Sequence, residues 1–237
     1  MTEFTVLLLT LFFASLVTFR KESSFSKEKM PALKFFMAIV IVLGHLSIRV
    51  PSGWIQPCRC WGSPFVSMFL FVSGYGMWQS TLSHSERSFA SVLKRVWKLA
   101  LPYLLTVFLY YIIVRIPSGE TNLNIWDAVL AGTSKQYHLW FVFAIIYLYL
   151  AFYLCMRFRS KRAIIVSLFA LVSATIVMLR QVGYDRCWWV SLLAFPTGCL
   201  YSMFHERVNE IIFKSRLSYF MAMAVAVTGV GLSYLLN

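Results

Sequence analysis

The residues best suited to chemistry in this 237-residue chain are a lysine and a histidine in one apolar stretch. Lys34 and His45 lie eleven positions apart within Met30–Ile48, a segment long enough for a helix to cross a membrane. At about 100° per residue, the two side chains lie roughly 20° apart on one helix face, about 16 Å apart along its axis. A lysine near a helix end can extend its amine to the headgroups, but an imidazole at membrane depth needs bonding partners or a function. His45 is therefore the leading catalytic candidate, and a histidine bonded to a neighbouring helix is the alternative.

A second candidate segment is the apolar run FLFVSGYGMW, which begins at Phe69. Its small residues, Gly74 and Gly76 among them, let a neighbouring helix or a ligand approach closely. Ser73 and Tyr75 carry hydroxyl groups that are able to hydrogen-bond an acceptor substrate or line a cavity. Helix packing is the more common use of such a segment, and ligand binding is the alternative.

Three cations form a third candidate site near the start of a later apolar span. Arg95 and Lys98 are three positions apart and therefore share a helix face, and Lys94 adjoins them. Arginine binds phosphate oxygens in a bidentate manner and lysine acts as a point charge, so the cluster suits a phosphorylated ligand. Anchoring to anionic lipid at the cytoplasmic surface is the ordinary alternative.

Two further pairs complete the candidate residues. His138 and Trp140 open a span at its outer end, where tryptophan is usual and where the histidine could share a cavity with His45. Pro196 and Gly198 lie inside a later span, which they are expected to kink or break. Irregular backbone in a membrane is tolerated where it is buried in protein or lines a cavity, and a simple kink is the alternative.

The elements that must position these residues are apolar spans, which predict an all-α, polytopic membrane bundle with one transmembrane domain over residues 1–237. Hydrophobic residues make up 59% of the chain and charged residues only 13%, against about 25% charged in soluble domains. The first and third spans are short, so local irregularity is expected there. The eight expected spans are Phe4–Phe19, Met30–Ile48, Pro64–Trp78, Val96–Val114, Leu139–Met156, Ala163–Leu179, Cys187–Phe204 and Leu217–Leu236.

The placement of positive charge predicts the topology. Sixteen of the 22 Lys and Arg residues lie in the first, third, fifth and seventh connections, which are therefore expected in the cytoplasm, with the N-terminus outside. The same placement accounts for the net charge of +13 without nucleic acid as a partner. Lys34 is then expected at the cytoplasmic edge and His45 toward the outer half of the membrane.

The sequence disfavours several other chemistries. Acidic residues lie outside the expected spans, which argues against proton-driven transport. The five cysteines include no metal-type pair, so no metal site is expected. Cys58 and Cys60 fall on the same expected side as Cys187, where a disulfide is feasible; free thiols are the alternative.

Taken together, these segments resemble the acyltransferase 3 family of integral membrane acyltransferases. The family's first motif, a basic residue and a histidine separated by ten residues, corresponds to Lys34 and His45, with lysine where arginine is usual. The remaining elements correspond to Phe69–Tyr75, to Arg95 and Lys98 before Pro102, to His138–Phe141 and to Phe195–Gly198.

The resemblance implies an enzyme of the cell (inner) membrane that modifies cell-surface polysaccharide. Such an enzyme transfers an acyl group, with acetyl expected, from cytoplasmic acyl-CoA to a hydroxyl or amine of an extracytoplasmic glycan or lipid-linked sugar. Acyl-CoA is then the donor substrate, no permanently bound cofactor is expected, and the partners are membrane lipid, acyl-CoA and the carbohydrate acceptor. The implied residues are His45 for catalysis, Lys34, Lys94, Arg95 and Lys98 for acyl-CoA, and Ser73, Tyr75, His138 and Trp140 for the acceptor or cavity.

Several alternatives remain open at this point. The family generally has more helices than the eight spans counted here, so a shortened and inactive member is one alternative. A non-catalytic transporter of a glycan or lipid is another. If the chain is an active acyltransferase, His45 acts either as a general base or as the residue that carries the acyl group covalently.

Overall fold

The computed structural model describes residues 30–50, 62–83, 89–110, 112–113, 140–215 and 217–221. These residues form helices and the turns between them, and no strand occurs among them, in agreement with the all-α prediction. The predicted span Phe4–Phe19 and most of Leu217–Leu236 lie outside the described residues. The elements in chain order are α2 (Met30–Arg49), α3 (Gly62–Ser83), α4 (Phe89–Tyr110), α6 (Trp140–Cys155), α7 (Lys161–Gln181), the 3-10 turn η4 (Arg186–Trp188) and α8 (Ala194–Ile212).

The helices agree with five predicted spans but correct their bounds. Helix α3 is unbroken over 22 residues, so the expected irregularity of the short third span is not found. Helix α4 begins at Phe89, seven residues before its predicted start, and therefore contains the three cations. Two segments, Pro31–Ile48 and Lys161–Gln181, are long and apolar enough to cross a membrane, and α6 is a shorter apolar helix. The count of eight spans therefore stays a prediction.

The prediction for Cys187–Phe204 is wrong in its placement of the helix. Residues 186–193 form η4 and turns, and α8 begins only at Ala194. Pro196 therefore lies in the first turn of α8, where a helix needs no backbone N–H from it, and it does not kink the interior. Cys187 lies in the connection and is a free thiol, as are the buried Cys155 and Cys199.

The chain divides into two compact units, which are described separately. Unit 1 comprises residues 1–69 and 203–237, and unit 2 comprises residues 70–202. Helix α3 contributes residues 62–69 to unit 1 and residues 70–83 to unit 2. The prediction of a single domain over the whole chain is not tested by this division.

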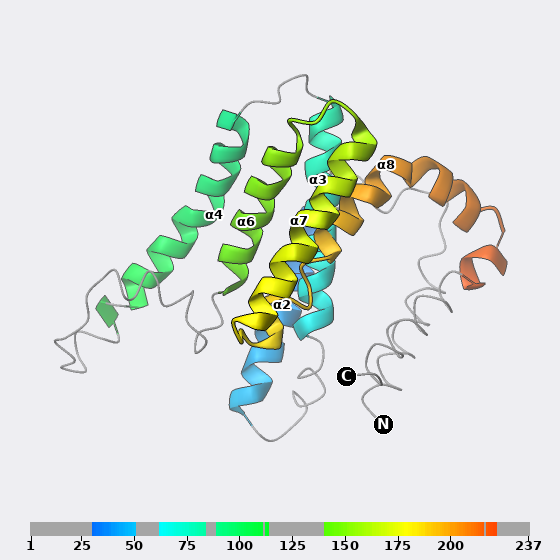
Figure 1. Cartoon of the computed structure of the whole chain (residues 1–237). Helices are drawn as coiled ribbons and strands as arrows, with labels where there is room; N and C mark the ends of the chain where they lie inside the picture. The colour runs from blue at the N-terminus through cyan, green and yellow to red at the C-terminus, as the bar shows by residue number, and fades with distance from the viewer. Residues whose placement is uncertain are drawn as a thin grey trace. The chain divides into compact units, whose positions relative to one another are not determined.

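Helix α6 forms the centre of unit 2. It packs between α4 and α7, which lie on either side of it (Figure 1). Because both neighbours need an apolar surface, α6 is apolar around its whole circumference, and Leu148 and Phe152 are fully buried. On the α7 side, the hydroxyl groups of Tyr147 and Thr175 hydrogen-bond each other.

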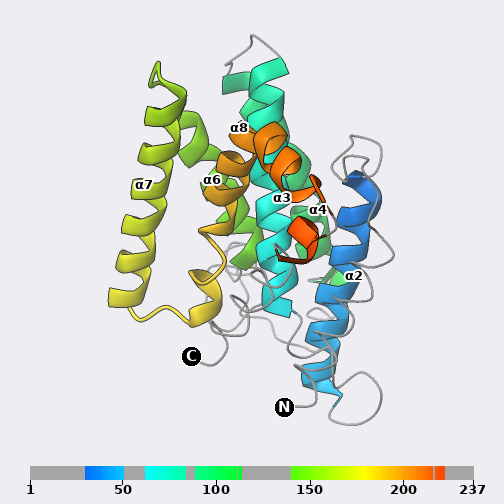
Figure 2. The same ribbon diagram turned by 90° about the vertical axis from the view of Figure 1, so that its right-hand side faces the viewer.

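Helix α3 and the first turns of α8 cross at unusually close range (Figure 2). A Cβ added at Gly74 would lie 2.1 Å from the Phe195 carbonyl oxygen, and one added at Gly198 would lie 2.0 Å from the Phe71 carbonyl oxygen. Only glycine fits at these two positions, because each faces rigid backbone rather than a flexible side chain. The Cys199 thiol also donates to the Gly74 carbonyl, at 3.3 Å. Gly76 faces open space and takes no part in the crossing.

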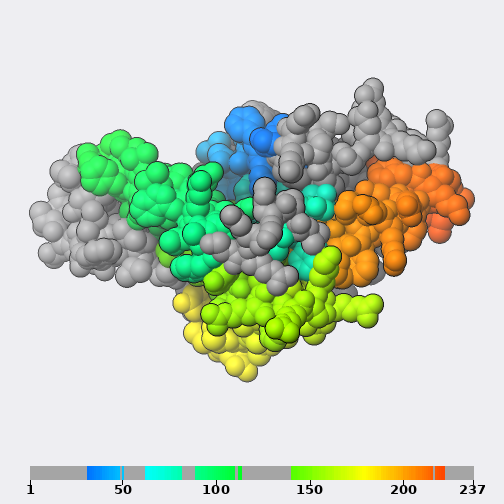
Figure 3. Space-filling view, turned by 90° about the horizontal axis from the view of Figure 1, so that it is seen from above, coloured from blue at the N-terminus to red at the C-terminus, as the bar shows by residue number. Residues whose placement is uncertain are grey.

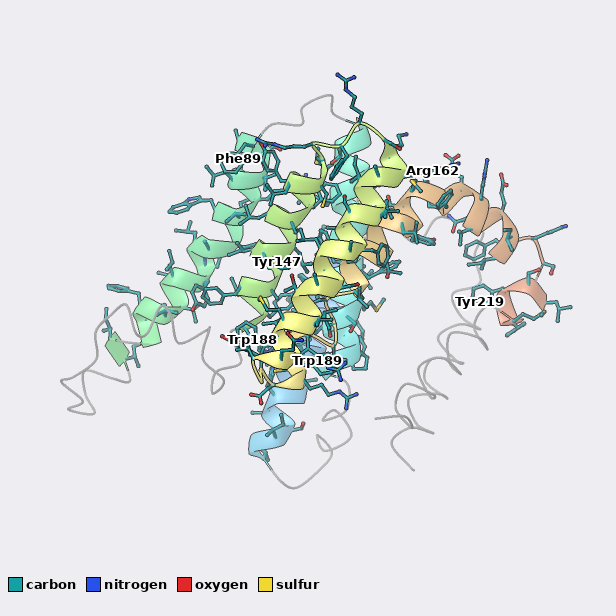
Figure 4. The ribbon with its side chains drawn as sticks, viewed as in Figure 1. Phe89, Tyr147, Arg162, Trp188, Trp189 and Tyr219 are labelled. Atoms are coloured by element: carbon teal, nitrogen blue, oxygen red, sulfur yellow. The ribbon has the colours of Figure 1, made fainter. Side chains whose placement is uncertain are left out.

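The two ends of unit 2 differ in chemistry. Figure 4 places Phe89 and Arg162 at one end and Trp188 and Trp189 at the other. Helices α4 and α7 both present surface at the Phe89 end, as the space-filling view shows (Figure 3). The Phe89 end is rich in positive charge, because α7 begins there. Exposed cations of the α6–α7 connection and of the first turn of α7 lie at this end; they are Arg157, Arg159, Lys161 and Arg162.

We predict that Gly74→Ala destabilises the protein, by roughly 1–3 kcal/mol as in other overpacked sites. The added methyl group would meet the Phe195 carbonyl and force α3 and α8 apart. The matched control is Gly76→Ala, two residues along the same helix, where nothing lies within 4 Å. The midpoints of thermal unfolding in detergent should fall for the first variant only, and equal midpoints would contradict the close crossing.

A second prediction concerns Cys187, whose exposed side chain lies in the connection expected outside the cell. Partial burial of the sulfur and the nearby Asp185 carboxylate both raise the pKa of this thiol. The thiolate fraction is therefore low at pH 7 and rises only as the pH passes the elevated pKa. In a Cys58→Ser/Cys60→Ser variant, a membrane-impermeant maleimide should label Cys187 in intact cells, slowly at neutral pH and faster in alkali. Labelling only after permeabilisation would place Cys187 inside the cell and contradict the predicted topology.

Candidate functional site

Helix α2 carries Lys34 and His45 on one unbroken helix, as their spacing predicted. Both side chains are half-buried in unit 1. The ten residues between them have no polar side chain, so these two are the ionisable groups within the apolar body of the helix. Close to His45, Gly44 and Ser47 are buried, and Ser47 Oγ donates to the Gly44 carbonyl oxygen at 2.7 Å. This bond satisfies the serine within its own helix.

Lys34 is held against the first part of α3. Its Nζ lies 5.7 Å from the centroid of the Phe69 ring, and the rings of Phe36 and Phe65 meet edge to face at 6.0 Å. These two contacts set α2 and α3 antiparallel within unit 1. An ammonium group over an aromatic face gains about 0.5–2 kcal/mol, more where water is excluded. Lys34 thus has an aromatic partner inside unit 1.

The three cations of α4 are not equivalent. Arg95 is half-buried, whereas Lys94 and Lys98 are exposed. Val92 and Tyr103, which lie near the same face as Arg95, are buried, and Tyr103 packs edge to face on Phe143 of α6 at 5.7 Å. Arg95 therefore borders the face of α4 that packs on α6, and the two lysines are directed away from it.

Arg95 belongs to a polar cluster that joins three helices of unit 2. The Tyr149 hydroxyl of α6 lies close to the Ser73 hydroxyl of α3, and the Arg95 charge acts on the same Tyr149 hydroxyl. Ser73 is 3% exposed and Tyr149 is 8% exposed. Within the described residues, Ser73 Oγ makes no hydrogen bond of strict geometry, so the Tyr149 hydroxyl is its nearby polar neighbour. The buried Trp78 Nε1 on the same helix also makes no hydrogen bond within that part of the chain.

The remaining predicted site residues lie in packed aromatic clusters or outside the described residues. Tyr75 is buried, its ring lies 6.0 Å from that of Tyr201 on α8, and its hydroxyl interacts with Gln79. Trp140 is buried against Trp188, at 6.1 Å between ring centroids. These positions make both residues part of the packing around the site. His138 lies outside the described residues.

The Trp188 end of unit 2 combines aromatic rings with a cation. Tyr184 packs edge to face on Trp188 at 5.2 Å, and the Arg180 guanidinium lies 4.9 Å over the Trp189 ring. Figure 4 shows Trp188 and Trp189 together at this end. Such a group of tryptophan, tyrosine and arginine side chains is typical of a membrane–water interface.

Sequence reasoning missed Tyr149. Helix α6 is apolar on every face and contains three tyrosines, so periodicity does not single out one of them. The available signal was chemical, because a tyrosine buried in an apolar helix needs a partner for its hydroxyl. Phe195 was noted as the first residue of the Phe195–Gly198 element, without a packing role, but its fully buried ring packs on both Tyr149 and Phe152, at 6.0 and 6.3 Å.

Comparison with known proteins identifies the family. A family model described as an acyltransferase domain matches residues 29–237, which include both basic sites, His45 and the α3–α8 crossing. No curated protein and no solved structure matches the chain. Because the family match covers most of the sequence, this chain belongs to the acyltransferase 3 family of membrane acyltransferases.

Proposed function

We propose that this acyltransferase moves an acyl group, acetyl being the expected one, from cytoplasmic acyl-CoA to a hydroxyl or amine of an extracytoplasmic glycan or lipid-linked sugar. The observation that supports this most is the half-buried His45 on α2, a helix otherwise apolar enough to cross a membrane. An ionisable side chain in such a helix is costly and is normally retained for function. The protein would act as a multi-pass protein of the cell membrane.

In the proposed reaction, His45 is the general base. Its neutral imidazole accepts the proton of the acceptor hydroxyl while the hydroxyl oxygen attacks the thioester carbonyl. The resulting tetrahedral intermediate then collapses, the carbon–sulfur bond breaks and the CoA thiolate leaves. The imidazolium returns its proton to the thiolate, so the histidine ends the cycle neutral and the acceptor carries the acyl group.

The donor is proposed to bind at the cationic part of α4. Arg95 is half-buried and borders the face packed on α6, so its guanidinium is partly desolvated. A partly desolvated guanidinium binds phosphate more strongly than one in water, and it does so in a bidentate manner. Lys94 and Lys98 are exposed and would add long-range attraction for the same anionic group. Lys34, although held over Phe69, remains a further proposed contact for acyl-CoA.

The first prediction from this proposal is that His45→Ala lowers the rate of acyl transfer by about 10²–10⁴-fold, the contribution expected of a general base. The variant is compared with wild type at equal abundance in membrane vesicles that contain the natural glycan acceptor, using radiolabelled acetyl-CoA. The matched control is His205→Ala, which alters another half-buried helical histidine and should leave the rate within about twofold.

Two outcomes would oppose the catalytic assignment. Unchanged transfer by the His45→Ala protein would remove this histidine from the mechanism. Movement of glycan across wild-type vesicles without any acetyl-CoA, and without label in the product, would favour a transporter instead.

The second prediction concerns donor binding by purified protein in nanodiscs without anionic lipid. Arg95→Ala should raise the Kd for acetyl-CoA by roughly tenfold to a hundredfold, as expected for a lost charge-assisted hydrogen bond. Lys98→Ala should raise it by less, because this lysine is exposed. Isothermal titration calorimetry measures both values.

The control for charge alone is Arg157→Ala/Arg159→Ala. These two arginines are exposed in the α6–α7 connection, and their loss removes more positive charge than Arg95→Ala does. The Kd of this double variant for acetyl-CoA should stay near that of wild type. Equal weakening by the control and by Arg95→Ala would mean that the cations act only as a diffuse positive surface.

A further inference from the structure

Helices α4 and α6 are held in an antiparallel register that sets Arg95 opposite Tyr149. The rings of Phe89 and Tyr153 lie 5.2 Å apart near one end of the pair, and those of Tyr103 and Phe143 lie 5.7 Å apart farther along. Both helices rise about 1.5 Å per residue, so counting from the first contact puts Arg95 level with position 147 of α6, and counting from the second puts it level with position 151. Tyr149 lies midway between these two positions, and the Arg95 charge acts on its hydroxyl.

The other side of Tyr149 is fixed by α3, which runs parallel to α6 in unit 2. The Trp78 ring packs edge to face on Phe152 at 6.3 Å, and the Thr81 hydroxyl interacts with the Met156 sulfur at 3.9 Å. One and a half turns earlier on α3, the same register brings the Ser73 hydroxyl to Tyr149. The Tyr149 hydroxyl thus lies between a buried serine and an arginine.

The Tyr149 ring itself cannot turn away without repacking the core. It lies against Phe195, which is 0% exposed and sits at the glycine crossing of α3 and α8. A side chain packed in this way has one rotamer available to it. The position of its hydroxyl is therefore set by four helices of the same unit.

Among the described residues of unit 2, no carboxylate lies near Arg95 to compensate its charge. Within the described residues of unit 2, the sole carboxylate belongs to Asp185, three residues from Trp188 and so at the end of the unit opposite Phe89. A neutral hydroxyl can accept one N–H of the guanidinium and orient it, but it does not cancel the positive charge. The remaining N–H groups stay available for an anion.

We propose that Tyr149 is a positioning residue, whose hydroxyl accepts a hydrogen bond from Arg95 and donates one to Ser73, so that the guanidinium is presented to the phosphate groups of acyl-CoA. The identity of this anion rests on the function proposed above. The role of Tyr149 in orienting Arg95 rests on the helix registers, the burial and the absence of a neighbouring carboxylate among the described residues of unit 2.

The test is a double-mutant cycle on acetyl-CoA binding in nanodiscs. Tyr149→Phe keeps the ring on Phe195 and removes only the hydroxyl. It should raise the Kd about threefold to tenfold in the wild-type background, as expected for one hydrogen bond, and by less than about twofold in the Arg95→Ala background. Binding of acetyl-pantetheine, which lacks the nucleotide phosphates, should not respond to Tyr149→Phe.

Tyr147→Phe is the matched control. It removes a hydroxyl two residues away on the same helix, one that bonds Thr175 on the opposite side of α6. Its Kd should match that of wild type, and the thermal midpoints of both tyrosine variants should agree within about 2 °C, the shift expected for a loss well below 1 kcal/mol in a chain of this size.

Three results would overturn the proposal. If Tyr149→Phe weakens binding equally with and without Arg95, or if Tyr147→Phe weakens it as much, Tyr149 acts through general packing. If Arg95→Ala weakens binding but Tyr149→Phe does not, only the positioning role fails. If Arg95→Ala itself leaves acetyl-CoA binding intact, both the positioning role of Tyr149 and the donor site of the proposed function fail.

Discussion

The contact on which unit 2 depends is the approach of two backbones where α3 crosses α8. Carbonyl oxygens of Phe71 and Phe195 occupy the space that side chains would fill at Gly198 and Gly74. In a membrane, such close packing stabilises helix pairs by dispersion and weak backbone contacts, since lipid offers no hydrophobic gain for their association. The crossing places Phe195 in the core, Phe195 supports Tyr149, and Tyr149 reaches toward both Ser73 and Arg95. A shift at one glycine would therefore be transmitted to the cationic site.

In the arrangement proposed for unit 2, Arg95 is oriented by a hydroxyl group and no carboxylate of the described residues of that unit neutralises it. Burying part of a guanidinium costs free energy unless its N–H groups find acceptors. A carboxylate partner would meet that cost but would compete with any incoming anion. Hydroxyl groups offset part of the cost of burying the guanidinium and leave its positive charge in place. Such an environment suits a site that binds an anionic substrate transiently. In unit 1, the aromatic face beneath Lys34 has a similar effect, because a cation–π contact also preserves the net charge.

The sequence predicted the helical elements well where an apolar run has clear ends. It gave α2, α6 and α7 to within two residues, because each is bounded by polar or charged residues. It placed α4 too late, because the run of cations from Lys94 to Lys98 resembles a connection, although cations are compatible with a helix near the membrane surface. It placed α8 too early, because Trp188, Trp189 and their neighbours are as apolar as a helix interior. Those residues pack in turns against Trp140 and Tyr184 instead.

By itself, the sequence determined the residue types at the site and their order along single helices, including the shared helix of Lys34 and His45, since both depend only on local spacing. The tertiary structure decided which cation of α4 is partly buried, that Tyr75 and Trp140 belong to packed clusters, and that the Tyr149 hydroxyl lies near Ser73 and is subject to the Arg95 charge. Those outcomes depend on the registers between α3, α4, α6 and α8. A register is fixed by how side chains of separate helices interlock, and an apolar helix such as α6 carries no periodic signal that records it.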